Sequence, residues 1–158
     1  MDGLGGLHKA ASNRPERTRA APRGALYYSH VMQTFKKIIL STGADGRARF
    51  REESIELPEG NPQAMLSRLF PSSGYQLRHS PVGFRSQWHC TPKGQWVFIL
   101  SGEMEIGLQD GSTRVFRPGQ HFFSDDTLPA GASFDPKVHG HWSAQRGADP
   151  LVTLFLKV

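Results

Sequence analysis

The sequence has little that would place it in a membrane or on a secretory route. It has no apolar run near the roughly 18 residues that a transmembrane helix needs. The N-terminus lacks the apolar core of a secretory signal. Cysteine is almost absent: Cys90 is the only one, so no intramolecular disulfide can form. A lone thiol is typical of a reducing compartment, and we therefore predict a cytoplasmic protein with no membrane partner.

More than half of the excess basic charge lies in residues 1–31. The formal net charge is +5, but residues 1–31 contain five basic and two acidic side chains, whereas residues 32–158 contain fourteen and twelve. The larger part therefore has mixed charge and no basic stripe interleaved with aromatic residues. This pattern predicts no nucleic-acid partner.

Residues 1–31 are rich in Gly, Ala, Arg and Pro and poor in apolar side chains. Such a composition does not bury enough surface to offset the entropy of ordering, which predicts a basic, disordered tail. The compact domain is then expected over residues 32–158, and Met32 is a candidate start. A transit peptide is the alternative, and two acidic residues and Pro15 argue against it.

Turn signals, in contrast, are abundant. The 17 Gly and 11 Pro separate short apolar runs, as in proteins made of short strands. The clearest alternation places Met104, Ile106 and Leu108 on one face of a strand. Strands are expected over residues 34–40, 47–57 (at an edge), 63–70, 75–80, 95–100, 103–109, 113–116, 120–124 and 151–158. The absence of a convincing helical pattern predicts an all-β sandwich or small barrel.

One stretch, Gly83–Gly102, stands out for its polar residues in a strand-like pattern. It reads GFRSQWHCTPKGQWVFILSG, with a turn between two expected strands. Alternation along the first strand predicts a shared face for Arg85, Gln87, His89 and Thr91. Such a hairpin could be a binding site, or a core with two unusual polar residues.

The spacing of this stretch resembles the first motif of cupin barrels, which is Gly, five residues, His-x-His, three or four residues, Glu, six residues and Gly. Two later features resemble the second motif, a Pro-Gly turn and a Gly-His pair. The matching residues are Gly83, His89, Gln95, Gly102, Pro118-Gly119 and Gly140-His141. The resemblance covers about residues 83–143. It implies a double-stranded β-helix, or jelly-roll, barrel over about residues 34–158.

In metal-dependent cupins, two histidines and a glutamate of the first motif bind one metal together with a histidine of the second. The resemblance assigns two of these positions to His89 and His141, and the other two to Thr91 and Gln95. Two imidazoles and a neutral amide make a poor site for a divalent metal. The two expectations are therefore no cofactor, or a divalent metal (Fe, Mn, Ni or Zn) held by His89, Gln95 and His141, with His139 as a further candidate ligand.

Two functions remain open. The first is a cupin-fold protein that binds a small polar or anionic molecule in the barrel cavity, with a degenerate or absent metal site. The alternative is a metal-dependent enzyme, of dioxygenase or isomerase type, that uses His89 and His141. Whether the chain is an enzyme stays open, and no catalytic residue is assigned. The expected ligand-binding residues are Arg85, Gln87, His89, Thr91, Gln95 and His141.

Three further expectations concern an outer strand face, the lone cysteine and a pair of aspartates. Trp96, Phe98 and Leu100 share one strand face, and cupins often pair through outer strands, so the resemblance implies a homodimer. Cys90 is expected to point away from His89 as an apolar filler. Asp125-Asp126 is expected to cap a loop.

Overall fold

The computed structural model describes residues 33–158, and this range contains strands and turns but no helix. None of it forms a helix long and apolar enough to cross a membrane. The predicted disordered tail lies outside the described residues. The strands are β1 (Thr34–Thr42), β2 (Ala48–Glu56), β3 (Glu59–Asn61), β4 (Ala64–Leu66), β5 (Gly74–Ser80), β6 (Gln95–Ser101), β7 (Glu103–Gly107), β8 (Thr113–Phe116), β9 (His121–Asp125), β10 (Trp142–Arg146) and β11 (Leu151–Lys157).

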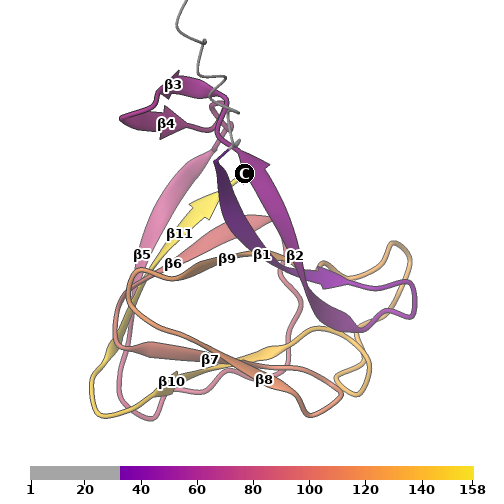
Figure 1. The fold of residues 1–158 in the computed structure, drawn as a ribbon. Helices are drawn as coiled ribbons and strands as arrows, with labels where there is room; N and C mark the ends of the chain where they lie inside the picture. Colours follow the sequence, from indigo (N-terminus) through magenta and orange to yellow (C-terminus); the bar gives the residue numbers. More distant parts are fainter. Residues whose placement is uncertain (1–32) are drawn as a thin grey trace, which may run out of the picture. The chain divides into compact units, whose positions relative to one another are not determined.

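Two sheets face each other and form a barrel (Figure 1). The larger sheet has the order β2-β1-β9-β6-β11-β5, and the smaller has the order β10-β7-β8. Neighbouring strands are antiparallel except β1 and β9, which pair in parallel although they are far apart in sequence. The charge-rich β2 lies at a sheet edge, as predicted. The predicted all-β jelly-roll barrel is confirmed.

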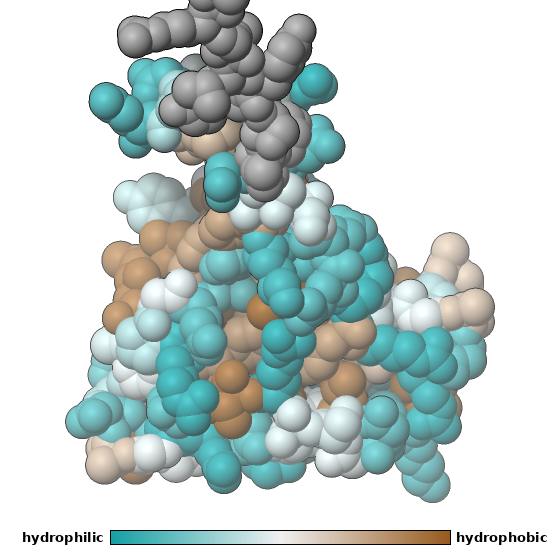
Figure 2. Space-filling model, viewed as in Figure 1, coloured by the Kyte–Doolittle hydropathy of each residue, from teal (hydrophilic) through white to brown (hydrophobic). Residues whose placement is uncertain are grey.

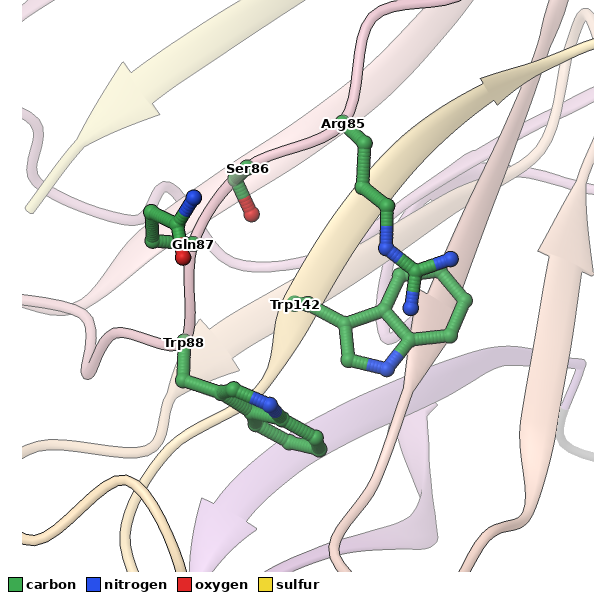
Figure 3. A pocket seen from close by; sticks show the side chains of 5 residues that line it. All are labelled: Arg85, Ser86, Gln87, Trp88 and Trp142. Atoms are coloured by element: carbon green, nitrogen blue, oxygen red, sulfur yellow. The ribbon is translucent and has the colours of Figure 1, made fainter.

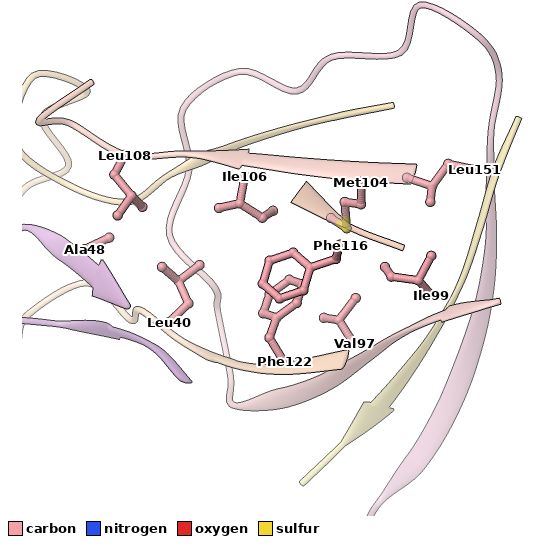
Figure 4. Packing of buried hydrophobic residues seen from close by; sticks show 10 residues of the cluster. All are labelled: Leu40, Ala48, Val97, Ile99, Met104, Ile106, Leu108, Phe116, Phe122 and Leu151. Carbon is pink, nitrogen blue, oxygen red and sulfur yellow. The ribbon is translucent and has the colours of Figure 1, made fainter. Parts of the chain in front are cut away.

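The core lies between the sheets, because alternate side chains of each strand point inward. Met104 and Ile106 of β7 are buried, and so is Leu108 just beyond it, as the alternation predicted. Phe116 of β8 meets Phe122 of β9 with their ring centroids 4.5 Å apart. Figure 4 shows these side chains converging between the two sheets.

The first half of the predicted hairpin is not a regular strand. Residues 83–94 run irregularly beside β10, and their ladder contacts are isolated bridges from Arg85 to Ala144 and from His89 to His141. Gly83 has a φ of 87°, outside the strand region, and Pro92 has no amide hydrogen to donate. The expected strand is therefore wrong here, whereas β6 is confirmed.

The segment predicted as a strand over residues 63–70 is a strand only in β4. It belongs to a β3–β4 hairpin that projects from the barrel (Figure 1), and we call residues 59–70 the arm. Leu66, Leu69 and Phe70 of the arm are 59%, 95% and 53% exposed. Figure 2 shows further apolar residues exposed below the arm on the β5 side.

Candidate functional site

Two histidines meet where residues 83–94 pass β10. His89 and His141 exchange two backbone hydrogen bonds of 2.9 Å, and their ring centroids are 4.5 Å apart. This approach depends on Gly140, which has a φ of 75°. A Cβ atom on Gly140 would lie 2.1 Å from the carbonyl oxygen of His89. The Gly-His pair of the sequence therefore meets a local steric requirement.

A buried carboxylate orients His141. Asp126 is 0% exposed, and its Oδ2 accepts a hydrogen bond of 2.6 Å from Nδ1 of His141. The other oxygen, Oδ1, accepts bonds from the hydroxyls of Thr91 at 2.7 Å and Ser124 at 3.2 Å. With its proton on Nδ1, a neutral His141 has Nε2 as its available acceptor. The prediction that Asp126 caps a loop is therefore wrong.

His89 lies at the exposed mouth of the site. Its Nδ1 donates to the carbonyl oxygen of Gln87 at 2.9 Å, which again makes Nε2 the available ring nitrogen. Partial burial lowers the pKa of His89 below its ordinary value of 6.5, opposed by the Gln87 carbonyl, and the nearby His141 and Arg78 lower it further. His89 is therefore a neutral imidazole at pH 7.

Both histidines line a cavity of about 100 Å³ inside the barrel. Its wall also contains Thr91 and polar side chains from four strands, among them Gln95 of β6. The Oε1 atom of Gln95 accepts a hydrogen bond from the ammonium group of Lys157. The remaining lining residues are Arg78, Pro92, Val97, Met104, Phe122, Ser124, Ser143 and Phe155.

Arg78 of β5 reaches this cavity, although the sequence reasoning did not select it. Its guanidinium carbon lies 5.2 Å from the ring centroid of Phe84 and 4.8 Å from that of Phe155. Its Nε and Nη2 atoms are buried and have no hydrogen-bond partner among the described residues. Burial lowers the pKa of Arg78. The two N–H groups lie on one edge of the guanidinium, the edge that binds a carboxylate through two parallel hydrogen bonds.

The structure divides the expected ligand-binding residues into two groups. Four of them line the interior cavity: His89, Thr91, Gln95 and His141. Arg85 and Gln87 instead line a surface pocket with Trp88 and Trp142 (Figure 3). The guanidinium carbon of Arg85 lies 3.7 Å from the ring centroid of Trp142. The expected shared face is wrong because residues 83–94 are not a pleated strand.

Two other histidines lie away from the cavity. Nδ1 of His139 accepts a hydrogen bond of 3.0 Å from the backbone amide of Asp135, so this ring is not brought to His141. His121 is on the outer face of the large sheet, stacked on Phe35 with a centroid distance of 4.6 Å. The candidate third imidazole is thus not part of the site in this conformation.

The donor set of the cavity does not fit a tightly held divalent cation. It offers two imidazoles, while the Gln95 oxygen is bonded to Lys157 and the Thr91 hydroxyl to Asp126. The charge of Arg78 in the same cavity would repel a cation. Within residues 33–158, no group of three or more His, Cys, Asp or Glu side chains is placed to hold a metal ion.

Gly140 offers a matched test of the backbone contact between the two histidines. Gly140→Ala and Gly131→Ala introduce the same left-handed strain, since their φ angles are 75° and 76°. An added Cβ meets nothing within 4 Å at Gly131, but meets the His89 carbonyl at Gly140. We expect Gly140→Ala to lower the free energy of unfolding by about 1–3 kcal/mol more than Gly131→Ala, as measured in urea. Equal losses would contradict the contact.

The lowered pKa of His89 predicts a pH-dependent stability. Below pH 6.5 the unfolded chain takes up the His89 proton more readily than the folded chain, so stability falls until the pH passes the lower folded pKa. In His89→Gln this contribution is absent, and the free energy of unfolding should vary less between about pH 7 and pH 5. Urea unfolding at several pH values measures it. Parallel curves for the two proteins would show that His89 titrates normally.

Comparisons with known proteins give structural neighbours only. No family model and no curated protein matches the chain. The cupin domain of Schizosaccharomyces pombe Cnp3 is 14% identical, with 79% of this chain and 84% of that chain covered and a TM-score of 0.37. A putative mannose-6-phosphate isomerase from Ralstonia eutropha is 18% identical, with coverages of 87% and 97% and a TM-score of 0.32. A putative ethanolamine utilization protein Q from Salmonella typhimurium is 15% identical, with coverages of 80% and 95% and a TM-score of 0.35.

The chain's own architecture defines the fold. Two sheets of short strands close around one core, and a parallel pair joins β1 to β9. The two motif segments meet at His89 and His141. This is a cupin-fold protein.

Proposed function

We propose that this cupin-fold protein binds a small anionic molecule in the cavity of its barrel and needs no metal to do so. The observation that carries the proposal is the buried edge of Arg78, with two N–H donors that no described residue accepts from. A buried donor without an acceptor costs about 1–3 kcal/mol, and more when the group is charged. An anion at this edge would form two charge-assisted hydrogen bonds.

The charges around the cavity support an anion as the ligand. The carboxylate of Asp126 is committed to His141, Thr91 and Ser124, so it does not pair with the guanidinium. Lys157 brings a second positive charge to Gln95, which lines the cavity. The rings of Phe84 and Phe155 flank the Arg78 guanidinium and restrict solvent there, which strengthens a charge interaction at its edge.

A metal-dependent enzyme is the alternative, and one observation favours it. The hydrogen bond from His141 to Asp126 is of the kind that orients metal-binding histidines. Elemental analysis of the chain, purified from metal-supplemented medium, separates the two functions. A stoichiometric metal that is lost in His89→Ala would support the enzyme and count against the metal-free site.

The anion proposal predicts a specific role for Arg78. Acetate should raise the melting temperature of the full chain, whereas acetamide, which has similar size but no charge, should not. Arg78→Met should abolish the shift. Arg78→Lys should retain at most a small part of it, because an ammonium group keeps the charge but lacks the paired N–H edge. Differential scanning calorimetry with each additive at one ionic strength measures these shifts.

Arg117→Met is the matched control, since it removes the same charge from an exposed arginine that pairs with Glu103 on the surface. It should leave the acetate shift intact. An acetate shift of equal size in Arg78→Met and Arg117→Met would place the anion elsewhere. No acetate shift in the unsubstituted chain, at concentrations up to about 0.1 M, would reject the proposal.

We also propose that two copies of the chain pair through the arm. The arm projects apolar side chains and, with Trp96 and Phe98 of β6, lines an apolar groove of about 550 Å³. One chain therefore supplies both a protruding apolar segment and a groove that could receive it. A two-fold axis would let each arm enter the groove of the other copy. Glu59 and Arg68 both line the groove, so the same axis could bring opposite charges together.

The pairing proposal predicts a dimeric mass by light scattering. Leu69 is 95% exposed, so Leu69→Asp should leave the monomer folded and convert the dimer to a monomer. Val82→Asp is the control, because Val82 is also an exposed apolar residue, at 55%, but does not line the groove. A monomeric mass for the unsubstituted chain at about 50 μM would contradict the proposal.

A further inference from the structure

Arg78 and the two histidines line the same cavity but have different hydrogen-bond requirements. The Arg78 edge can only donate, because a guanidinium has no acceptor atom. The two histidines have the opposite requirement. Nδ1 of each ring already donates, to the Gln87 carbonyl in His89 and to the Asp126 carboxylate in His141. A ring that carries only this one proton can only accept at Nε2. Both rings line the cavity that Arg78 also lines.

A ligand that satisfies both Arg78 and a histidine needs a pair of acceptors and a donor. The acceptor pair must be planar and closely spaced to match Nε–H and Nη2–H of Arg78, which a carboxylate provides. The donor must reach an imidazole nitrogen, which a hydroxyl group provides. A keto acid satisfies Arg78 only, because its carbonyl oxygen cannot donate to Nε2 of His89 or His141.

The size of the cavity limits the length of the ligand. The volume is about 100 Å³, and a water molecule occupies roughly 30 Å³ in the liquid. The space is sufficient for an acid of about two to four carbons. The apolar side chains of Val97, Met104 and Phe122 line the same space, where an uncharged carbon skeleton would pack.

We infer that the ligand is a short hydroxycarboxylate, with its carboxylate on the Arg78 edge and its hydroxyl group donating to a histidine Nε2. This inference rests on the proposed anion site and goes beyond it, since it adds a requirement for a hydroxyl group. It also assigns a role to each histidine other than metal binding. His89 and His141 then select among acids that Arg78 accepts equally.

Isothermal titration of the full chain at pH 7.5 tests the inference with glycolate, lactate, propionate, pyruvate and lactamide. Lactate and glycolate should bind best. Propionate and pyruvate, which lack the hydroxyl donor, should bind about tenfold more weakly, because one hydrogen bond is lost and an acceptor is left unpaired. Lactamide, which lacks the charge, should bind more weakly still. Arg78→Met should remove binding of every acid.

Two ring substitutions locate the hydroxyl group. His89→Phe keeps an aromatic ring at the exposed mouth but removes the acceptor, so it should reduce the preference for lactate over propionate several-fold. His121→Phe is the control, because His121 stacks on Phe35 outside the barrel, and it should keep the full preference. A preference that is unchanged both in His89→Phe and in His141→Phe would leave the hydroxyl group without either ring as its acceptor, and would overturn the inference.

The failures of the two proposals are distinguishable. If propionate or pyruvate binds as tightly as lactate, and Arg78→Met abolishes binding of both, the anion site stands and the hydroxyl requirement is wrong. If none of the acids binds, the anion site and the inference fall together. If lactate and lactamide bind equally, the hydroxyl requirement has no link to a carboxylate on Arg78, and the inference is wrong.

Discussion

The buried carboxylate of Asp126 is the interaction on which the candidate site depends. It lies directly after β9 and joins two segments that are distant in sequence: the turn at Thr91 and His141, which directly precedes β10. A buried charge is tolerated only when hydrogen bonds satisfy it, and Asp126 receives three, from His141, Thr91 and Ser124. These bonds hold His141 in one orientation and one tautomer. Through the backbone pairing of His141 with His89, they also fix the mouth of the cavity.

This arrangement separates the two kinds of charge inside the barrel. Asp126 accepts a hydrogen bond from His141, whereas Nε and Nη2 of Arg78 have no hydrogen-bond partner among the described residues. This separation is the reason for proposing an anionic ligand, with the two histidine rings as acceptors for a donor group of that ligand. Thr91 and Gln95 stand where metal-dependent cupins have ligands, and here they bond to Asp126 and Lys157. Both side chains are thus part of the hydrogen-bonded frame around the cavity.

The all-β class could be predicted from the sequence because strand alternation is a local signal, and the resemblance to two cupin motifs added the jelly-roll barrel and the two histidines. The alternation around Met104 and the Gly-His spacing at Gly140 each describe a few consecutive residues. Asp126 could not be found in this way, because two of its three partners lie 35 residues before it and 15 residues after it. Arg78 was missed because β5 inverts the usual pattern. Its apolar residues Tyr75 and Leu77 are 68% and 64% exposed, while the charged Arg78 faces the cavity. The shared face expected for Arg85 failed because it assumed a regular strand.

The central claim is that the Nε–H and Nη2–H groups of Arg78 bind an anion inside the barrel. The most direct measurement is the NMR signal of the Arg78 Nε–H group, assigned by its loss in Arg78→Lys. On addition of lactate, this proton should shift downfield and exchange more slowly with water, while the signal of the exposed Arg117 stays unchanged. An Arg78 signal that stays fixed while lactate binds elsewhere on the protein would contradict the account.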